Sequence, residues 1–216
     1  MTTPRLFLHA LAGLSTLFLV NCANKKPITP EALAGKKETF VNPFPAGTYD
    51  HFKADPSFPK TFGVWKNEEL LSRTDASNSS IKVNLSIQRA TLMNGEEIAM
   101  DYPICSGTAE RPTPTGTFYI LEKIVDKKSN RYGKFLDAAG EVVDGNADAV
   151  LGKPPAGGSF AGAPMRYWMR LTNDGVGHHI GPIRRVASSH ACVRGPSATI
   201  PIVYSKVKVG TRVVIE

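Results

Sequence analysis

Cysteine is scarce in this chain, with three among 216 residues, at positions 22, 105 and 192. Small exported domains that depend on disulfides carry many more, so the chain is not a disulfide scaffold. Paired C-x-x-C and H-x₃₋₅-H spacings are missing, which argues against a dedicated zinc site. Long basic runs with interleaved aromatic residues are missing too, although the formal net charge is +7. The charge indicates a generally basic surface that suits an anionic polymer or envelope, and no nucleic-acid partner is expected.

A long apolar run is also missing near the N-terminus, where Leu6–Val20 gives only 15 residues. That length is short for a membrane span but typical of a signal peptide, and Arg5 supplies the only charge before it. The run ends in LVNC at residues 19–22, which resembles a bacterial lipobox with Asn21 in place of the preferred small residue. We predict a signal peptide over residues 1–22 and export to the periplasm or cell envelope. Lipidation of Cys22 would anchor the protein to a membrane; a secretory signal with a chance cysteine is the alternative.

Residues 23–79 are predicted to be a proline-rich tether and N-terminal extension. Six prolines fall within residues 23–60, where they interrupt regular structure. A short helix is predicted over residues 66–73.

From residue 80 onward the pattern is that of β-strands. Alternating apolar residues predict a half-buried strand over 81–88 that continues through 90–93, and Asn94-Gly95 predicts a hairpin turn to a partner strand over 97–105. After Gly195 a short helix is expected that stops near Pro201. A long loop is predicted over 127–162, which shows little periodicity. Further strands are predicted over 117–124, 165–171, 176–180 and 212–216.

Chemically reactive residues concentrate between Gly177 and Gly195. His190 and Cys192 are two residues apart, so on an extended segment they share a face, whereas His178 and His179 would point to opposite faces. A thiol reacts as thiolate, and a neighbouring imidazole favours that form, so Cys192 is a candidate nucleophile. A buried structural thiol and a zinc site with two histidines and this cysteine are the alternatives.

The motif SHACVR at residues 189–194, preceded by His179 and a Gly-Pro turn, resembles the L,D-transpeptidase signature. Residues 102–118, YPICSGTAERPTPTGTF, resemble a second stretch of that family, and the end of the chain resembles its closing Gly-Thr-x-Val-x-Ile. Two departures stand out. Ala191 replaces the usual glycine, and only nine residues separate His179 from Ser189, fewer than usual.

The resemblance covers about residues 80–216, the predicted catalytic domain. It implies a mainly β fold, a sandwich or barrel with short helices and a long active-site loop that covers the groove. It makes Cys192 the nucleophile and His179 the base, oriented by the carbonyl of Ile180. The residues that would shape the oxyanion hole and the substrate site are Ala191, Ser189, His190 and Arg194.

Three arginines and the second thiol have open or minor roles at this point. Arg194 fits either a loop-holding salt bridge or the binding of a substrate carboxylate. Arg184 and Arg185 are expected to be solvated, although they could meet an anionic peptide. Cys105 stands where the family usually has serine, and we expect it to be structural.

The resemblance also implies a substrate, namely the tetrapeptide stem of peptidoglycan. The cysteine would form a thioester, release D-alanine and transfer the acyl group to an acceptor amine in a cross-linking reaction. Water in place of the amine would give an L,D-carboxypeptidase, and a catalytically weak wall-binding lipoprotein is a further alternative. No metal or organic cofactor is expected.

Overall fold

The computed structural model describes residues 40–216, and this part of the chain is mainly β, as the sequence predicts. The predicted signal peptide, Cys22 and the first part of the tether lie outside the described residues. Three short helices accompany the sheets within residues 40–216: α1 (Tyr49–Ala54), α2 (Glu68–Ser72) and α3 (Ile200–Lys206). None of the helices in this range is long and apolar enough to cross a membrane.

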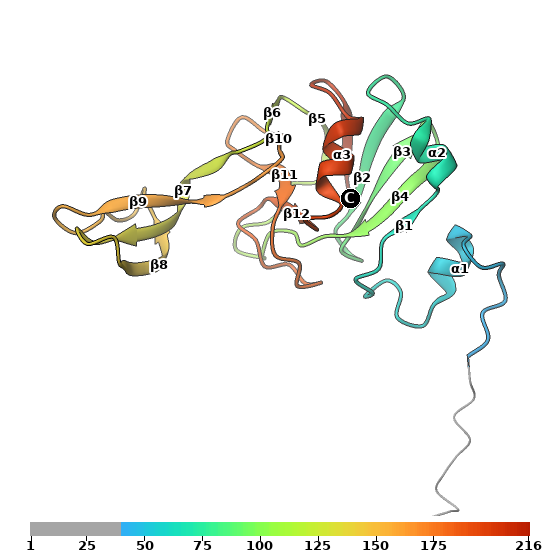
Figure 1. The fold of residues 1–216 in the computed structure, drawn as a ribbon, viewed down its shortest axis with the longest axis horizontal. Coiled ribbons are helices and arrows are strands. Elements are labelled where there is room, and N and C mark those ends of the chain that lie inside the picture. The colour runs from blue at the N-terminus through green and yellow to red at the C-terminus, as the bar shows by residue number, and fades with distance from the viewer. Residues whose placement is uncertain (1–39) are drawn as a thin grey trace, which may run out of the picture. The chain divides into compact units, whose positions relative to one another are not determined.

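The described strands form three sheets (Figure 1). The largest has the order β1-β4-β3-β2-β13-β5 and consists of β1 (Trp65–Lys66), β2 (Ser79–Asn84), β3 (Arg89–Asn94), β4 (Glu97–Pro103), β5 (Gly116–Tyr119) and β13 (Arg212–Ile215). The second has the order β12-β11-β10-β6 and consists of β6 (Glu122–Ile124), β10 (Trp168–Arg170), β11 (Gly177–Ile180) and β12 (Val193–Gly195). The third has the order β8-β7-β9 and consists of β7 (Lys128–Leu136), β8 (Val142–Asp148) and β9 (Ser159–Pro164).

The strand predicted to run from residue 81 through 93 is two strands, β2 and β3, which pair antiparallel. The chain turns between them at 85–88, where the Asn84 carboxamide oxygen accepts a hydrogen bond from the Ile87 N–H at 3.2 Å and Gln88 has a φ of 54°. Such a local side-chain bond competes with strand pairing, which the alternation of apolar residues does not reveal. The hairpin at Asn94-Gly95 is confirmed, with Gly95 at a φ of 56°.

Another predicted strand is also divided in the structure. The segment predicted over 117–124 divides into β5 and β6, which belong to different sheets. The Ile120 N–H donates to the Thr211 carbonyl at 3.0 Å, and the next N–H, of Leu121, donates to the Arg170 carbonyl at 2.8 Å. The chain therefore passes from one sheet to the other at this point.

The hydrophobic core lies between the six-stranded sheet, α3 and the second sheet. Ile81 and Val83 of β2 and Ile200 and Val203 of α3 are almost completely buried in one cluster. Burial of each such side chain contributes roughly 1.5–3 kcal/mol. The expectation that the helix would stop near Pro201 is wrong, because α3 begins at Ile200 and carries Pro201 in its first turn. The first turn needs no N–H from that residue, so proline is tolerated there.

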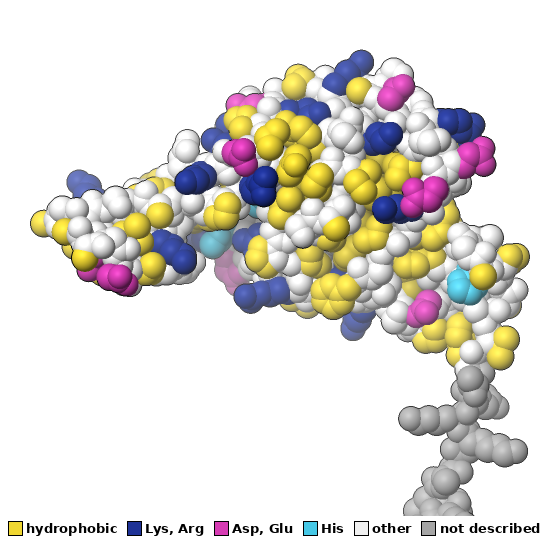
Figure 2. All heavy atoms as spheres, viewed as in Figure 1, with side chains coloured by type: hydrophobic (Ala, Val, Ile, Leu, Met, Phe, Trp, Pro, Cys, Tyr) yellow, Lys and Arg dark blue, Asp and Glu magenta, His cyan; other side chains and the backbone are white. Residues whose placement is uncertain are grey.

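The sequence predicts a loop over residues 127–162. In the structure these residues contribute most of the β7–β8–β9 sheet. Figure 1 shows this sheet reaching away from the other two, and no helix or further sheet among residues 40–216 covers it. Phe135 and Ala147 are buried, whereas Val142 and Val143 are more than half exposed, as the apolar atoms scattered over this part of the surface in Figure 2 illustrate. A sheet with little buried face has no reason to alternate apolar and polar residues, so the sequence pattern does not reveal it.

Candidate active site

Two neighbouring strands of the second sheet bring the histidines and the cysteine together. β11 carries His178 and His179 and pairs in parallel with β12, so that His178 lies opposite Val193 and His179 opposite Arg194. Cys192 comes directly before β12. The strand can lie close to its neighbours because Gly177 has no side chain: a Cβ there would approach the Trp168 ring to 2.5 Å.

His179 is held as a neutral imidazole by its surroundings. Its Nδ1 lies 2.7 Å from the carbonyl oxygen of Ile180, the partner that the family resemblance implies. A carbonyl only accepts, so Nδ1 carries the hydrogen and Nε2 keeps a free lone pair. Burial lowers the pKa of His179 to about 4, since only 5% of the residue is exposed, against the opposing hydrogen bond. Near neutral pH this imidazole is therefore uncharged.

His178 occupies the opposite face, as the alternation of a strand requires. Its Nδ1 lies 2.7 Å from the Val193 carbonyl oxygen, and its Nε2 lies 3.0 Å from the Tyr102 hydroxyl. Burial lowers its pKa to about 4 as well. Both ring nitrogens have partners and the residue borders neither pocket described below, so His178 packs the sheet and is not available to a substrate.

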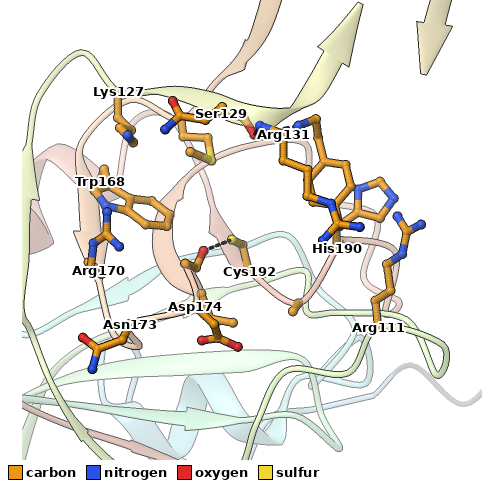
Figure 3. A pocket seen from close by; sticks show the side chains of 16 residues that line it. Arg111, Lys127, Ser129, Arg131, Trp168, Arg170, Asn173, Asp174, His190 and Cys192 are labelled. Atoms are coloured by element: carbon orange, nitrogen blue, oxygen red, sulfur yellow. Dashed lines mark hydrogen bonds between the residues drawn. The ribbon is translucent and has the colours of Figure 1, made fainter. Parts of the chain in front are cut away.

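The Cys192 thiol borders two adjacent pockets of about 430 and 330 Å³ (Figure 3). Its Sγ lies 3.9 Å from the carbonyl oxygen of Gly175. Burial raises the pKa of the Cys192 thiol, and a hydrogen bond from the Gly177 backbone and the charge of Arg194 oppose that effect. The resting site therefore combines a neutral thiol with a neutral imidazole.

The two pockets differ in their linings. His179 borders only the smaller one, together with apolar groups such as Ala163 and Pro164 and with the single cation Arg194. The larger pocket is bordered by four cationic side chains and by Trp168. The residues common to both pockets are Ser129, Tyr132, Met165, His190 and Cys192.

Ala191 adopts the left-handed backbone conformation, with a φ of 71°. Ala191 replaces the usual glycine of the family, and a residue with a side chain is strained in this conformation. The turn around Ala191 is held by hydrogen bonds from residues of the second family stretch, 102–118. The Thr113 hydroxyl donates to the Ala191 carbonyl at 2.7 Å and accepts from the Gly107 N–H at 2.8 Å. A Cβ at Gly107 would lie 2.7 Å from the Ala191 Cα, so glycine is required there.

Ser189 and His190 differ in what they contact. Ser189 is buried, and its hydroxyl donates to the Cys192 carbonyl while its N–H donates to the Ser106 carbonyl at 2.9 Å. It shapes the turn rather than the pocket. His190 stacks on Tyr132 of β7 with ring centroids 4.3 Å apart and an interplanar angle of 14°. This stack brings the β7–β8–β9 sheet to the cysteine turn, which the sequence did not reveal because Tyr132 has no motif around it.

Cys105 and Arg194 pair through their backbones but have separate side-chain environments. The Arg194 N–H donates to the Cys105 carbonyl at 2.9 Å, and the Cys105 N–H returns a bond at 3.0 Å. Cys105 is buried and free, with its Sγ 3.0 Å from the Ser188 hydroxyl, in keeping with a structural thiol. Arg194 has no carboxylate within 4.0 Å among residues 40–216, so the loop-holding salt bridge is not formed there. In the same range no three His, Cys, Asp or Glu side chains gather as a metal site would require.

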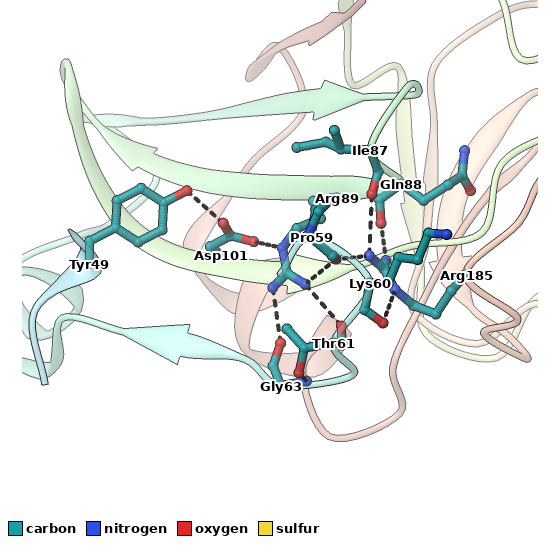
Figure 4. A network of polar contacts seen from close by, with 10 residues as sticks. All are labelled: Tyr49, Pro59, Lys60, Thr61, Gly63, Ile87, Gln88, Arg89, Asp101 and Arg185. Atoms are coloured by element: carbon teal, nitrogen blue, oxygen red, sulfur yellow. Dashed lines mark hydrogen bonds and ion pairs between the residues drawn. The ribbon is translucent and has the colours of Figure 1, made fainter. Parts of the chain in front are cut away.

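Arg185 is expected from the sequence to be solvated, but in the structure it joins the active-site loop to the N-terminal extension (Figure 4). Its guanidinium donates to the carbonyls of Pro59, Lys60, Ile87 and Gln88.

A second arginine, Arg89 of β3, donates to the same extension through the carbonyls of Pro59, Thr61 and Gly63 at 2.9–3.3 Å. It also forms a fully buried ion pair with Asp101 at 2.5 Å, and the Tyr49 hydroxyl donates to Asp101 at 2.6 Å. The loop that precedes Cys192 and the N-terminal extension that precedes β2 are therefore joined by one polar network.

Comparison with known proteins identifies the domain. The sequence matches the model of the L,D-transpeptidase catalytic domain over residues 78–215. The chain belongs to the L,D-transpeptidase family. No curated protein sequence matches this L,D-transpeptidase family member.

Solved structures of L,D-transpeptidases resemble the fold at low identity. One from Mycobacterium smegmatis is 19% identical, with a TM-score of 0.48 over 64% of this chain and 58% of that protein. L,D-transpeptidase 1 of Mycobacterium tuberculosis is 20% identical, with a TM-score of 0.45 over 65% and 62%. The catalytic domain of the Enterococcus faecium enzyme is 26% identical, with a TM-score of 0.46 over 64% and 96%. The chain thus spans less than two thirds of the two mycobacterial proteins.

Proposed function

We propose that this chain is a peptidoglycan L,D-transpeptidase that works through a cysteinyl thioester. The observation that carries the proposal is that a thiol and a neutral imidazole border the same pocket: Cys192 and His179 both line the smaller cavity, and the Ile180 carbonyl fixes the His179 tautomer. A nucleophile, a base and a group that orients the base are the parts that acyl transfer needs.

The reaction follows from these parts. His179 Nε2 takes the thiol proton, and the Cys192 sulfur attacks the carbonyl carbon of the third residue of the stem. The N–H groups of Ala191 and Cys192 would stabilise the oxyanion, an effect worth about 3–4 kcal/mol per donor in other enzymes. The C–N bond then breaks, and the departing amine of D-alanine takes the proton from His179. An acceptor amine attacks the thioester, gives a proton through His179 to the sulfur, and leaves as the cross-linked amide.

The position of His179 supports an assignment of the two pockets within this proposal. The same imidazole protonates the leaving amine and later deprotonates the acceptor amine, so both amines must lie in the smaller pocket that His179 borders. The acyl part of the donor then extends into the larger pocket on the other side of Cys192.

Two alternatives keep the fold but change the outcome. Water in the place of the acceptor amine gives an L,D-carboxypeptidase with the same thioester. A weakly catalytic wall-binding lipoprotein is favoured by the strained φ of Ala191, which lies where an oxyanion donor is needed. Export to the cell envelope and lipidation at Cys22 remain proposals that rest on the N-terminal sequence alone.

The test is intact-mass analysis after incubation with a stem tetrapeptide and an acceptor. Wild type and Cys105→Ser should both gain the mass of the acyl group, whereas Cys192→Ala should gain none while keeping its thermal unfolding profile. His179→Gln should lose acylation and His178→Gln should retain it wherever it folds. Acylation of Cys192→Ala, or equal loss in the two cysteine variants without unfolding, would overturn the assignment of the nucleophile.

A further inference from the structure

The larger pocket is markedly cationic for a cavity beside a thiol. Its border includes Arg111, Lys127, Arg131 and Arg170 against the single carboxylate of Asp174. Figure 3 shows these side chains arranged around Cys192 from several directions. They come from separate segments: Arg111 precedes β5, Lys127 precedes β7, Arg131 belongs to β7 and Arg170 to β10. The charge is therefore a property of the cavity and not of one basic run.

Two of the four cations are neutralised within the protein. Arg131 forms an ion pair with Asp148, with Nε at 3.1 and 3.0 Å from its two carboxylate oxygens. Arg170 Nε lies 3.2 Å from a carboxylate oxygen of Glu122. These pairs shape the wall of the pocket but leave little charge for a ligand.

Arg111 and Lys127 have no such partner in the described part of the chain. Both are partly buried, and neither has a carboxylate within 4.0 Å among the described residues 40–216. The Arg111 guanidinium is held over the Tyr132 ring, 5.3 Å from its centroid, which positions it at the pocket border. A cation withdrawn from water gains most from an anion that completes its hydrogen bonds, and a guanidinium suits a carboxylate in particular.

We propose that Arg111 and Lys127 make the larger pocket a carboxylate-recognition site for the acyl part of the donor peptide. This inference rests on the proposed function, because the acyl part enters the larger pocket only if His179 handles the amines in the smaller one. The site would favour donor stems in which the side-chain and α-carboxyl groups of the acyl part are free. Stems in which these groups of the acyl part are carboxamides would bind less well. A carboxamide keeps the size of a carboxylate but not its charge.

The closing experiment compares two stem tetrapeptides that differ only in whether these carboxyl groups are free or amidated. With wild type we expect about a tenfold higher kcat/KM of acylation for the free form, the size of one charge-assisted hydrogen bond. The preference should reside mainly in KM and weaken with added salt. Arg111→Gln and Lys127→Met should each reduce the ratio toward one, whereas Lys153→Met, which removes an exposed cation outside both pockets, should keep the wild-type ratio.

A binding measurement separates this inference from the reaction itself. In Cys192→Ser, calorimetry should show tighter binding of the free peptide than of the amidated one, with the difference lost on adding Arg111→Gln. Equal handling of both peptides by wild type, with acylation intact, overturns carboxylate recognition and leaves the proposed function standing. A binding preference in Cys192→Ser without acylation of wild type by either peptide overturns the proposed reaction and leaves the recognition site standing.

Discussion

Replacing Ala191 by glycine should stabilise the domain, against the usual effect of introducing glycine. The residue has a φ of 71°, where alanine costs roughly 1–2 kcal/mol more than glycine. Glycine in turn loses about 0.4–1 kcal/mol because its unfolded chain has more conformations. The difference centres on about 0.8 kcal/mol in favour of Ala191→Gly, or a Tm higher by about 2–3 °C for a domain of this size.

The assay is thermal unfolding of wild type and Ala191→Gly, with Ala198→Gly as the matched control. Ala198 is exposed in the turn before α3 and its φ is not in the left-handed region, so its replacement should lower the stability by about 0.4–1 kcal/mol. Acylation of Ala191→Gly should be at least as fast as in wild type, since glycine keeps the N–H. A Tm that falls in both variants by similar amounts would refute the strain at Ala191.

The remaining predictions concern pH and the polar network. The pKa of His179 is about 4, so the acid limb of acylation should lie near pH 4, and a limb near 6.5 in the pH profile would contradict its burial. His178 and His179 take up protons more readily when unfolded, so stability should be full above pH 6.5 and fall as the pH drops toward 4, as pH-dependent melting would show. Arg89→Met leaves the buried Asp101 without its ionic partner and should cost about 3–5 kcal/mol in chemical denaturation. Adding Asp101→Leu to the same chain should recover only part of this stability, because the carbonyls of Pro59, Thr61 and Gly63 still lack the Arg89 donor. Arg185→Met should mainly slow the labelling of Cys192 by thiol reagents, because it releases the loop from the N-terminal extension; an unchanged labelling rate would show that the network does not position the cysteine.

The sequence by itself determined the family and the cysteine turn. The six residues of SHACVR lie together in the chain, and the stretch around Gly107 packs beneath them, so two short motifs describe most of the turn. Alternation on β11 also distinguished His179 from His178 in the sequence, because a strand sends successive side chains to opposite faces. Strands with one buried face could be predicted from the sequence for the same reason, because their apolar and polar residues alternate.

Only the tertiary structure decided what surrounds the thiol. The β7–β8–β9 sheet buries too little to leave an alternating pattern, so neither the sheet nor the stack of Tyr132 on His190 was visible in the sequence. Arg185 reaches the Pro59 carbonyl across 126 residues of chain, and no local signal marks such a contact. Likewise, Arg111 and Lys127 meet at one pocket because separate segments converge there. Motifs and alternation record local chemistry and the burial of one face, whereas the charge of a cavity arises from side chains that only folding brings together.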